Sequence, residues 1–262
     1  MKVIILCGGK GMRIREVSAG IPKPMLFVGD RPIVWHIMKS YAAYGFKKFI
    51  LCLGHNSWAI KEFFLNYSVK TADVTVRLNQ QKSVVCHGLR DIEDWEITLA
   101  ETGEETEKGA RIFKVRQYLG QDKLFSVTYG DGLTDLNLGE LAEFHKRSGL
   151  LGTMTAIHPP SRYGVLAIKG RKITRYREKP KTSQGFINGG FMIFNREVID
   201  LYFDSSSNLD FEKQVLAKMA RDGVLGVFKH RGFWLGMDTP KEYLYLNKIW
   251  AQGKAPWEVW QK

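Results

Sequence analysis

The chain begins with the stretch Lys2-Val3-Ile4-Ile5-Leu6-Cys7-Gly8-Gly9-Lys10-Gly11-Met12-Arg13. Its first half is a continuous apolar, β-branched run, which is typical of a strand buried on both faces of a parallel sheet. Its second half is a glycine-rich turn. Glycines there let backbone N–H groups approach an anion closely, and Arg13 could neutralise two phosphate oxygens. The spacing matches neither a dinucleotide-binding fingerprint nor a P-loop, so taken alone the turn is weak evidence for phosphate binding, and a structural tight turn is the alternative.

Strand and helix patterns alternate after this turn. We expect, in chain order, helix 33–44, strand 48–53, helix 59–67, strand 125–129, helix 138–146, strands 152–156, 164–168 and 191–194, and helix 240–251. Such an order implies right-handed crossovers and a parallel sheet. We therefore predict an α/β fold with a parallel sheet flanked by helices. We predict one nucleotide-binding domain over 1–262, with a small insertion near 85–112 and a helical, aromatic tail over 240–262.

The composition is that of a basic globular protein, with a formal net charge of +12, 44% hydrophobic and 25% charged residues. An excess of positive charge suits substrates that are polyanions. Basic residues are not clustered with aromatics, which argues against a nucleic-acid partner. No apolar run is long enough to span a bilayer, so we expect no membrane partner and a cytoplasmic location. The three cysteines and six histidines match neither a disulfide framework nor a zinc site.

An acidic stretch interrupts this basic chain between Asp91 and Gly109. It contains Glu93-Asp94-Trp95-Glu96 and Glu101-Thr102-Gly103-Glu104-Glu105-Thr106-Glu107. We expect an extended hairpin or loop near the functional site. A solvated loop without a function is an equally good interpretation, because charged loops usually have none.

The segment Pro22-Lys23-Pro24-Met25 presents one lysine between two prolines. Prolines restrict the backbone, so this segment would hold the Lys23 ammonium at a fixed point. Such a charge is useful against a phosphate that gains negative charge during a reaction. The alternative is a rigid loop with a solvated lysine.

Two aspartates follow apolar segments at distant points of the chain. Asp131 lies in Tyr129-Gly130-Asp131-Gly132, at the carboxyl end of a predicted buried strand, where open α/β sheets bind ligands. Asp238 lies in Gly236-Met237-Asp238-Thr239. Two carboxylates are the expected way to hold Mg²⁺ together with substrate phosphates. Taken singly, either aspartate could be a turn or helix-cap residue.

A further pair of segments carries polar side chains suited to a sugar phosphate. Glu178-Lys179-Pro180 is followed by Asn188-Gly189-Gly190. A carboxylate and an amide can bind sugar hydroxyls, and a lysine can bind the phosphate.

Together these motifs resemble those of the sugar-1-phosphate nucleotidyltransferases. The resemblance implies a Rossmann-like α/β fold with a mixed, mostly parallel sheet flanked by helices. The resemblance runs from Met1 to about Trp260. Within the family, the chain is most similar to the cytidylyl branch. The segments that carry it are 22–25, Trp35-His36-Ile37-Met38-Lys39, Thr128-Tyr129-Gly130-Asp131-Gly132, Glu178-Lys179-Pro180-Lys181, Ile187-Asn188-Gly189-Gly190-Phe191, Gly232-Phe233-Trp234, Met237-Asp238-Thr239 and Gly253-Lys254-Ala255-Pro256-Trp257.

The resemblance implies a role for each matching residue. Catalysis would involve Lys23, Arg13 and Asp131, and Mg²⁺ would be held by Asp131 and Asp238. Sugar phosphate would be bound by Glu178, Lys179, Asn188 and Gly189. The nucleotide would be bound by Leu6, Gly8, Gly9, Gly11, Met12, Arg13, Lys23, Thr102, Gly103, Arg111 and Gly130. The implied substrates are CTP and glucose 1-phosphate, and the implied assembly is a homo-oligomer, a hexamer or trimer.

The chain departs from the family pattern at two places. Met12 stands where the family usually has threonine, which removes a hydroxyl that could contact phosphate, and 15–21 differs from the usual pattern. UTP or dTTP in place of CTP, or another sugar 1-phosphate, therefore remain alternatives. A non-catalytic nucleotide-sugar-binding module is the alternative from another class, although Lys23, Asp131 and Asp238 are all retained.

Overall fold

A computed structural model describes residues 1–9, 11, 14, 20–78, 83–88, 92–158, 165–169, 172–177, 185–204 and 208–261, with 165–169 and 172–177 as backbone only. Four of the predicted site residues lie outside the described residues. They are Met12, Arg13, Glu178 and Lys179.

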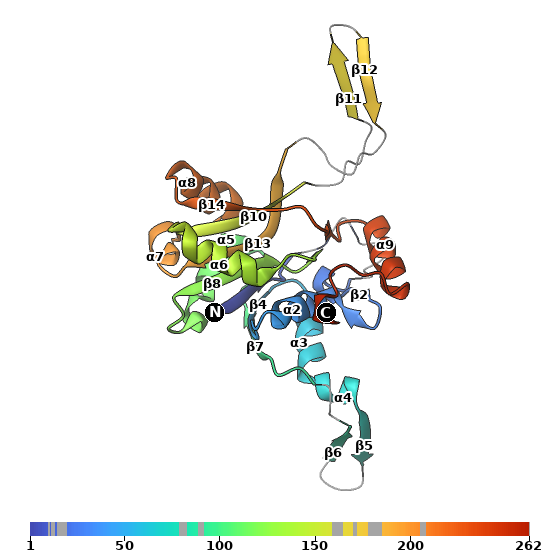
Figure 1. Ribbon diagram of the computed structural model, residues 1–262. Coiled ribbons are helices and arrows are strands. Elements are labelled where there is room, and N and C mark those ends of the chain that lie inside the picture. The colour runs from blue at the N-terminus through green and yellow to red at the C-terminus, as the bar shows by residue number, and fades with distance from the viewer. Residues whose placement is uncertain are drawn as a thin grey trace.

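The predicted mixed, mostly parallel sheet is confirmed (Figure 1). Within the described residues its seven strands lie in the order β14-β10-β13-β8-β1-β4-β7. Strands β8, β1, β4 and β7 run parallel, and β13 is antiparallel to both of its neighbours, β8 and β10. Their bounds are β1 Lys2–Leu6, β4 Lys48–Leu53, β7 Glu96–Glu101, β8 Leu124–Tyr129, β10 Gly152–Ile157, β13 Ile187–Asn195 and β14 Leu225–His230.

Helices cover both faces of this sheet, because alternate side chains of the buried strands point to opposite sides. Val3 and Ile5 pack with one apolar cluster, and Ile4 and Leu6 with the other. The first cluster includes α2 (Ile33–Ala43), α3 (Ser57–Leu65), α6 (Leu138–Ser148) and α9 (Pro240–Ala251). The second includes α5 (Lys108–Lys114), α7 (Val198–Tyr202), a π-helical turn (Phe211–Leu216) and α8 (Ala217–Arg221). A continuous apolar strand is therefore the expected sequence pattern for β1.

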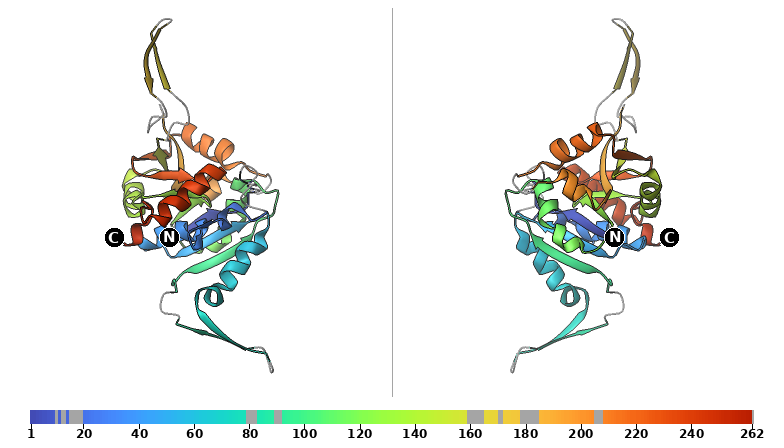
Figure 2. Two further views of the ribbon diagram at one scale, coloured as in Figure 1. Left: turned by 90° about the vertical axis from the view of Figure 1, so that its right-hand side faces the viewer. Right: turned by 90° about the vertical axis from the view of Figure 1, so that its left-hand side faces the viewer.

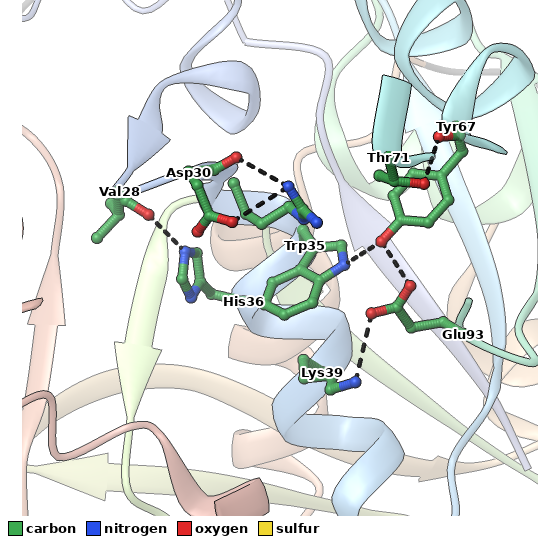
Figure 3. A network of polar contacts seen from close by, with 9 residues as sticks. Val28, Asp30, Trp35, His36, Lys39, Tyr67, Thr71 and Glu93 are labelled. Carbon is green, nitrogen blue, oxygen red and sulfur yellow. Dashed lines mark hydrogen bonds and ion pairs between the residues drawn. The ribbon is translucent and has the colours of Figure 1, made fainter. Parts of the chain in front are cut away.

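The C-terminal aromatic tail packs onto α2 around His36. Trp257 Nε1 donates to His36 Nδ1 at 3.3 Å, so the proton of the neutral ring is on Nε2, which donates to Val28 O at 2.8 Å. Figure 3 shows this second bond, and beside it the indole of Trp35 directed at Tyr67. Burial lowers the pKa of His36 to about 4. His36 is therefore a neutral structural residue that fastens the tail.

Two expectations about the middle of the chain are wrong in detail. The helix expected over 59–67 is two helices, α3 and α4 (Tyr67–Thr71), separated at Asn66. The acidic stretch is not one hairpin or loop: residues 102–107 do form a loop, but β7 joins the central sheet as an edge strand before it, and α5 begins at Lys108 after it. The acidic residues Glu96 and Glu101 are exposed on that edge strand, which is why charge concealed the strand pattern.

Two hairpins project from the body in different directions (Figure 2). One pairs β5 (Asp73–Arg77) with β6 (Ser83–His87), and the other pairs β11 (Val165–Lys169) with β12 (Lys172–Arg177). In the described part of the chain, no helix has the length and apolar character needed to cross a membrane.

Candidate active site

A cavity of about 930 Å³ opens at the carboxyl ends of β1 and β8. Its size is in the range of small-molecule sites. It is lined by Leu6, Cys7, Gly8, Gly9, Gly11, Lys23, Pro24, Glu104, Glu105, Thr106, Glu107, Lys108, Arg111, Tyr129, Gly130, Asp131, Asn188, Glu212, Trp234, Gly236 and Asp238. Ten of the residues predicted from sequence are among them, so one cavity gathers most of the predicted site.

A short ribbon brings the two aspartates together. Strand β9 (Gly132–Thr134) pairs antiparallel with β15 (Trp234–Gly236), and Gly132 lies opposite Gly236. Just beyond this pair, Met237 N donates to Asp131 O at 2.9 Å. Asp131 and Asp238 therefore emerge side by side, although they are far apart in sequence.

Asp238 is not the cap of the helix that follows it. Thr239 is the N-cap of α9 and forms a capping box with Glu242. Glu242 Oε2 also accepts from the backbone N–H of Asp238 at 2.8 Å. The capping role belongs to the neighbouring threonine, and the Asp238 carboxylate is directed into the cavity.

Lys23 lies between the two carboxylates. It begins a 3₁₀ turn, Lys23–Met25, that follows Pro22 in an extended conformation. Its Nζ donates to Asp131 Oδ2 at 2.7 Å and to Asp238 Oδ1 at 2.9 Å. Burial by itself would lower the pKa of Lys23. The two neighbouring carboxylates raise it by more, so the pKa of Lys23 lies above its ordinary value. The ammonium is therefore charged and held at a fixed point, as the flanking prolines predict.

The carboxylate pair has the chemistry of a Mg²⁺ site that relies on substrate. Oxygen ligands suit this ion, which usually keeps few protein ligands and takes the rest from phosphates and water. Among the described residues no cluster of three or more His, Cys, Asp or Glu side chains is placed to hold a metal. Asp131 and Asp238, with side chains 30% and 28% exposed, fit such a shared ion.

The three glycines described in the turn after β1 differ in their structural roles. A β-carbon on Gly8 would lie 2.2 Å from Arg111 Cζ, so Gly8 makes room for the guanidinium. A β-carbon on Gly9 would meet nothing within 4 Å, and Gly11 has a φ of +58°. Gly9 and Gly11 thus leave the backbone of the turn open toward the cavity, which suits a phosphate group.

Arg111 ties together the ends of three parallel strands. Its Nη1 donates to Leu53 O at 2.9 Å and to Thr102 Oγ1 at 2.7 Å, and its Nη2 donates to Gly8 O at 3.2 Å and Glu104 O at 3.0 Å. Burial lowers the pKa of Arg111 below its ordinary value. Four of its five N–H donors bond other described residues, so Arg111 shapes the cavity floor and brings its positive charge to the cavity.

Thr102 and Gly103 lie behind this floor. Thr102 is 1% exposed, and its carbonyl accepts from Thr106 Oγ1 at 2.7 Å and Lys114 Nζ at 2.8 Å. Gly103, with a φ of +98°, allows the tight turn that this pattern requires. The neighbouring segment 104–108 contributes the wall, so Thr106 is a lining residue that the sequence analysis missed.

The opposite wall is built around Asn188 at the start of β13. Asn188 Nδ2 donates to Tyr129 OH at 3.2 Å, and Tyr129 OH donates to Glu212 Oε1 at 2.8 Å. Gly189 does not line the cavity; its carbonyl accepts from Trp234 Nε1 at 2.6 Å. Because β13 is antiparallel to β8, its first residues lie beside the last residues of β8.

Several lining residues were not predicted from sequence. They are Cys7, Pro24, Glu104, Glu105, Thr106, Glu107, Lys108, Tyr129, Glu212, Trp234 and Gly236. Four of them directly adjoin predicted residues and could have been found from that position, namely Cys7, Pro24, Glu104 and Tyr129. Lys108 and Glu212 stand in no recognisable motif, and only the folded chain brings them to the wall.

The chain belongs to the nucleotidyl transferase family, whose sequence model matches residues 2–253. It is 41% identical to glucose-1-phosphate cytidylyltransferase of Salmonella typhimurium over 261 residues, covering 100% of both chains. The protein of the same name from Salmonella typhi is equally similar, with 41% identity over 261 residues and 100% coverage of both chains.

Solved structures show the same fold. HddC from Yersinia pseudotuberculosis superposes with a TM-score of 0.66 at 21% identity, over 95% of this chain and 99% of that one. At this identity the likeness establishes the architecture alone. The sequence relatives, by contrast, cover the chain from end to end.

Proposed function

We propose that this protein transfers the cytidylyl group of CTP to glucose 1-phosphate, producing CDP-glucose and pyrophosphate. The observation that carries the proposal is the placement of Lys23 between Asp131 and Asp238 at the cavity, beside the glycine turn. This arrangement sets a fixed positive charge and two metal-type ligands where a triphosphate and a sugar phosphate can meet. The end-to-end similarity to two glucose-1-phosphate cytidylyltransferases supports the choice of substrates.

The proposed chemistry is an in-line displacement at the α-phosphorus of the nucleotide. An oxygen of the sugar phosphate attacks, the bond from the α-phosphorus to the bridging oxygen breaks, and pyrophosphate leaves. The protein provides positioning and charge neutralisation, and no covalent enzyme intermediate is required. Lys23 opposes the charge that builds on the α-phosphate. Arg13 would act on the same phosphates, although it lies outside the described residues.

Mg²⁺ is the proposed cofactor, held by Asp131 and Asp238. When bound, it would neutralise charge on the triphosphate and fix the geometry of its oxygens. The nucleotide would lie along Gly8, Gly9 and Gly11, over the floor that Arg111 supports. The sugar would lie toward Asn188, with Glu178 and Lys179 supplied by the segment outside the described residues.

The test is a substrate panel read out by pyrophosphate release. The protein is incubated with Mg²⁺, each of CTP, UTP, dTTP, ATP and GTP, and each of several hexose 1-phosphates. We expect turnover to require a sugar 1-phosphate and to be fastest with CTP and glucose 1-phosphate. Equal or faster turnover with UTP or dTTP would overturn the base assignment, and no turnover with any pair would overturn the proposed reaction.

We further propose a homo-oligomer that covers the β5–β6 hairpin. Val74, Val76, Val84 and Val85 are each between 40% and 45% exposed, and Leu78 is 83% exposed. An isolated two-stranded hairpin is only marginally stable in water, and exposed valines on it favour contact with another chain. Sedimentation of the wild type and of Val76→Asp should show a larger species that the substitution dissociates. An unchanged assembly in the variant would exclude this hairpin as the contact.

A further inference from the structure

Four side chains on one wall of the cavity form a single hydrogen-bonded chain. Asn188 donates to Tyr129 at 3.2 Å, Tyr129 donates to Glu212 at 2.8 Å, and Lys108 donates to the same carboxylate oxygen. These residues come from β13, β8, the π-helical turn and α5, respectively. All four line the cavity that holds Asp131 and Asp238.

The donor and acceptor of each bond are fixed by the groups at the two ends of this hydrogen-bonded chain. The Glu212 carboxylate can only accept, so Tyr129 must donate to it, and the phenol oxygen is left to accept from Asn188. At the other end, Gly190 N–H can only donate, and it bonds Asn188 Oδ1 at 2.8 Å. The Asn188 amide therefore has one orientation. Among the described residues, these two bonds together use one of its two N–H groups and one of its two carbonyl lone pairs, which leaves one donor and one acceptor for a ligand.

The tyrosine ring itself is held in place by a glycine. Gly190 has a φ of +84°, and a β-carbon there would lie 2.6 Å from Tyr129 Cδ2. The ring thus packs directly on the backbone of β13, and the Lys108 ammonium lies 5.1 Å from its centroid.

We propose that Tyr129 and Glu212 are positioning residues that set which sugar 1-phosphate the enzyme selects. The inference rests on the proposed function and deepens it at the sugar end. With its amide fixed, Asn188 presents one donor and one acceptor to two neighbouring sugar hydroxyls. An epimer with one hydroxyl inverted leaves one of these polar groups unpaired, and such mismatches are how buried polar sites discriminate. If the amide could rotate, it would adapt to either epimer.

The first variant is Tyr129→Phe, which keeps the ring against Gly190 and removes only the hydroxyl. We expect the KM for glucose 1-phosphate to rise about fivefold to tenfold, the effect of losing one hydrogen bond in the site. The KM for CTP should stay within about twofold. The ratio of kcat/KM for glucose 1-phosphate over its C2 and C4 epimers, mannose and galactose 1-phosphate, should fall by about the same factor as the KM rises.

The chain offers a matched control in Tyr202. Its hydroxyl donates to Asp222 Oδ2 at 2.9 Å, and Lys218 Nζ lies 5.1 Å from its ring, so it repeats the Tyr–carboxylate–Lys arrangement away from the cavity. Tyr202→Phe should change neither KM nor the epimer ratio. If both tyrosine variants shift the thermal midpoint equally but only Tyr129→Phe moves the KM for sugar, a merely structural role is excluded.

A double-mutant cycle tests the link to Asn188. With Asn188→Ala in place, Tyr129→Phe should have no further effect on kcat/KM for glucose 1-phosphate, because the group it orients is gone. Glu212→Gln, whose amide can also donate, should relax the epimer ratio in the same direction. Additive effects in the cycle, or equal rises of both KM values in Tyr129→Phe, would overturn the inference while wild-type turnover still supports the reaction. Failure of the reaction would appear separately, as no wild-type turnover with any pair.

Discussion

The guanidinium of Arg111 lies where a side chain on Gly8 would begin. A β-carbon on Gly8 would stand 2.2 Å from Arg111 Cζ, and the same approach lets Arg111 Nη2 donate to Gly8 O at 3.2 Å. Gly54, after β4, is also crowded, since its β-carbon would lie 2.7 Å from Arg111 Nη1. The arginine thus fixes the start of the glycine turn from beneath, and both glycines are required by its bulk.

We predict that Gly8→Ala is far more harmful than Gly9→Ala. An alanine at position 8 must displace a guanidinium that four hydrogen bonds hold, at a cost of roughly 2–3 kcal/mol in the free energy of unfolding, as for a disrupted buried network. At position 9 the added methyl group meets nothing within 4 Å, and the change should stay within about 0.5 kcal/mol. Urea denaturation of both variants measures the difference. Equal midpoints would show that Arg111 moves aside freely.

We predict that Lys23→Ala lowers kcat far more than it weakens substrate binding. An interaction that strengthens as charge develops on the α-phosphate is lost from kcat, on the order of 10²-fold or more. Steady-state kinetics with CTP and glucose 1-phosphate measure both parameters. A variant with near wild-type kcat and only a raised KM would assign Lys23 to ground-state binding.

We predict that Asp131→Asn and Asp238→Asn each abolish turnover supported by Mg²⁺, and that the double variant is scarcely worse than either. Both carboxylates are assigned to one ion, and groups that act as a unit are strongly non-additive. The measurement is kcat/KM across a Mg²⁺ titration for the three variants.

The matched control for the aspartate variants is Asp210→Asn. Asp210 caps the π-helical turn by accepting from Lys213 N at 2.8 Å, so its replacement should affect stability within about 1 kcal/mol and leave the Mg²⁺ dependence unchanged. A normal Mg²⁺ dependence in either Asp131→Asn or Asp238→Asn would remove that residue from the metal site.

We predict that His36 makes the folded protein sensitive to acid. Its pKa is about 4 in the folded chain and about 6.5 in the unfolded chain. Because the folded pKa is the lower one, the unfolded state takes up the proton first. Stability is therefore complete above pH 6.5 and is lost as pH falls toward 4, by about 2 kcal/mol at pH 5. Urea denaturation at pH 7.5 and 5 should show a larger loss for the wild type than for His36→Gln. Equal losses in the two proteins would contradict the buried neutral ring.

Elements whose residues lie close together in the sequence could be predicted from the sequence pattern. The apolar run of β1, the run of β4 and the Pro240 start of α9 each follow from neighbouring residues alone. Strand β7 was missed because an edge strand is only half-buried, and its acidic ends look like a loop.

The residues of the candidate site also divide into those that a short sequence segment predicts and those that only the folded chain brings together. The turn at Gly8 and the proline-flanked Lys23 could be predicted, because one short segment defines each of them. Glu212 and Lys108 could not, because each reaches the wall only through the packing of the second apolar cluster beneath the sheet. The order of strands β10, β13 and β14, which sets the start of β13 beside Tyr129, is likewise decided by long-range pairing.

The β9–β15 ribbon has a consequence for how the protein is made. On the ribosome, the glycine turn and Lys23 emerge early, and Asp131 follows at mid-chain, whereas Trp234–Gly236 and Asp238 emerge near the end. The second carboxylate cannot reach the first until the last strand has paired with β9. A chain that stopped before β15 would thus contain Lys23 and Asp131 but could not assemble the carboxylate pair. The carboxylate pair can therefore form only after the chain has been synthesised past Asp238.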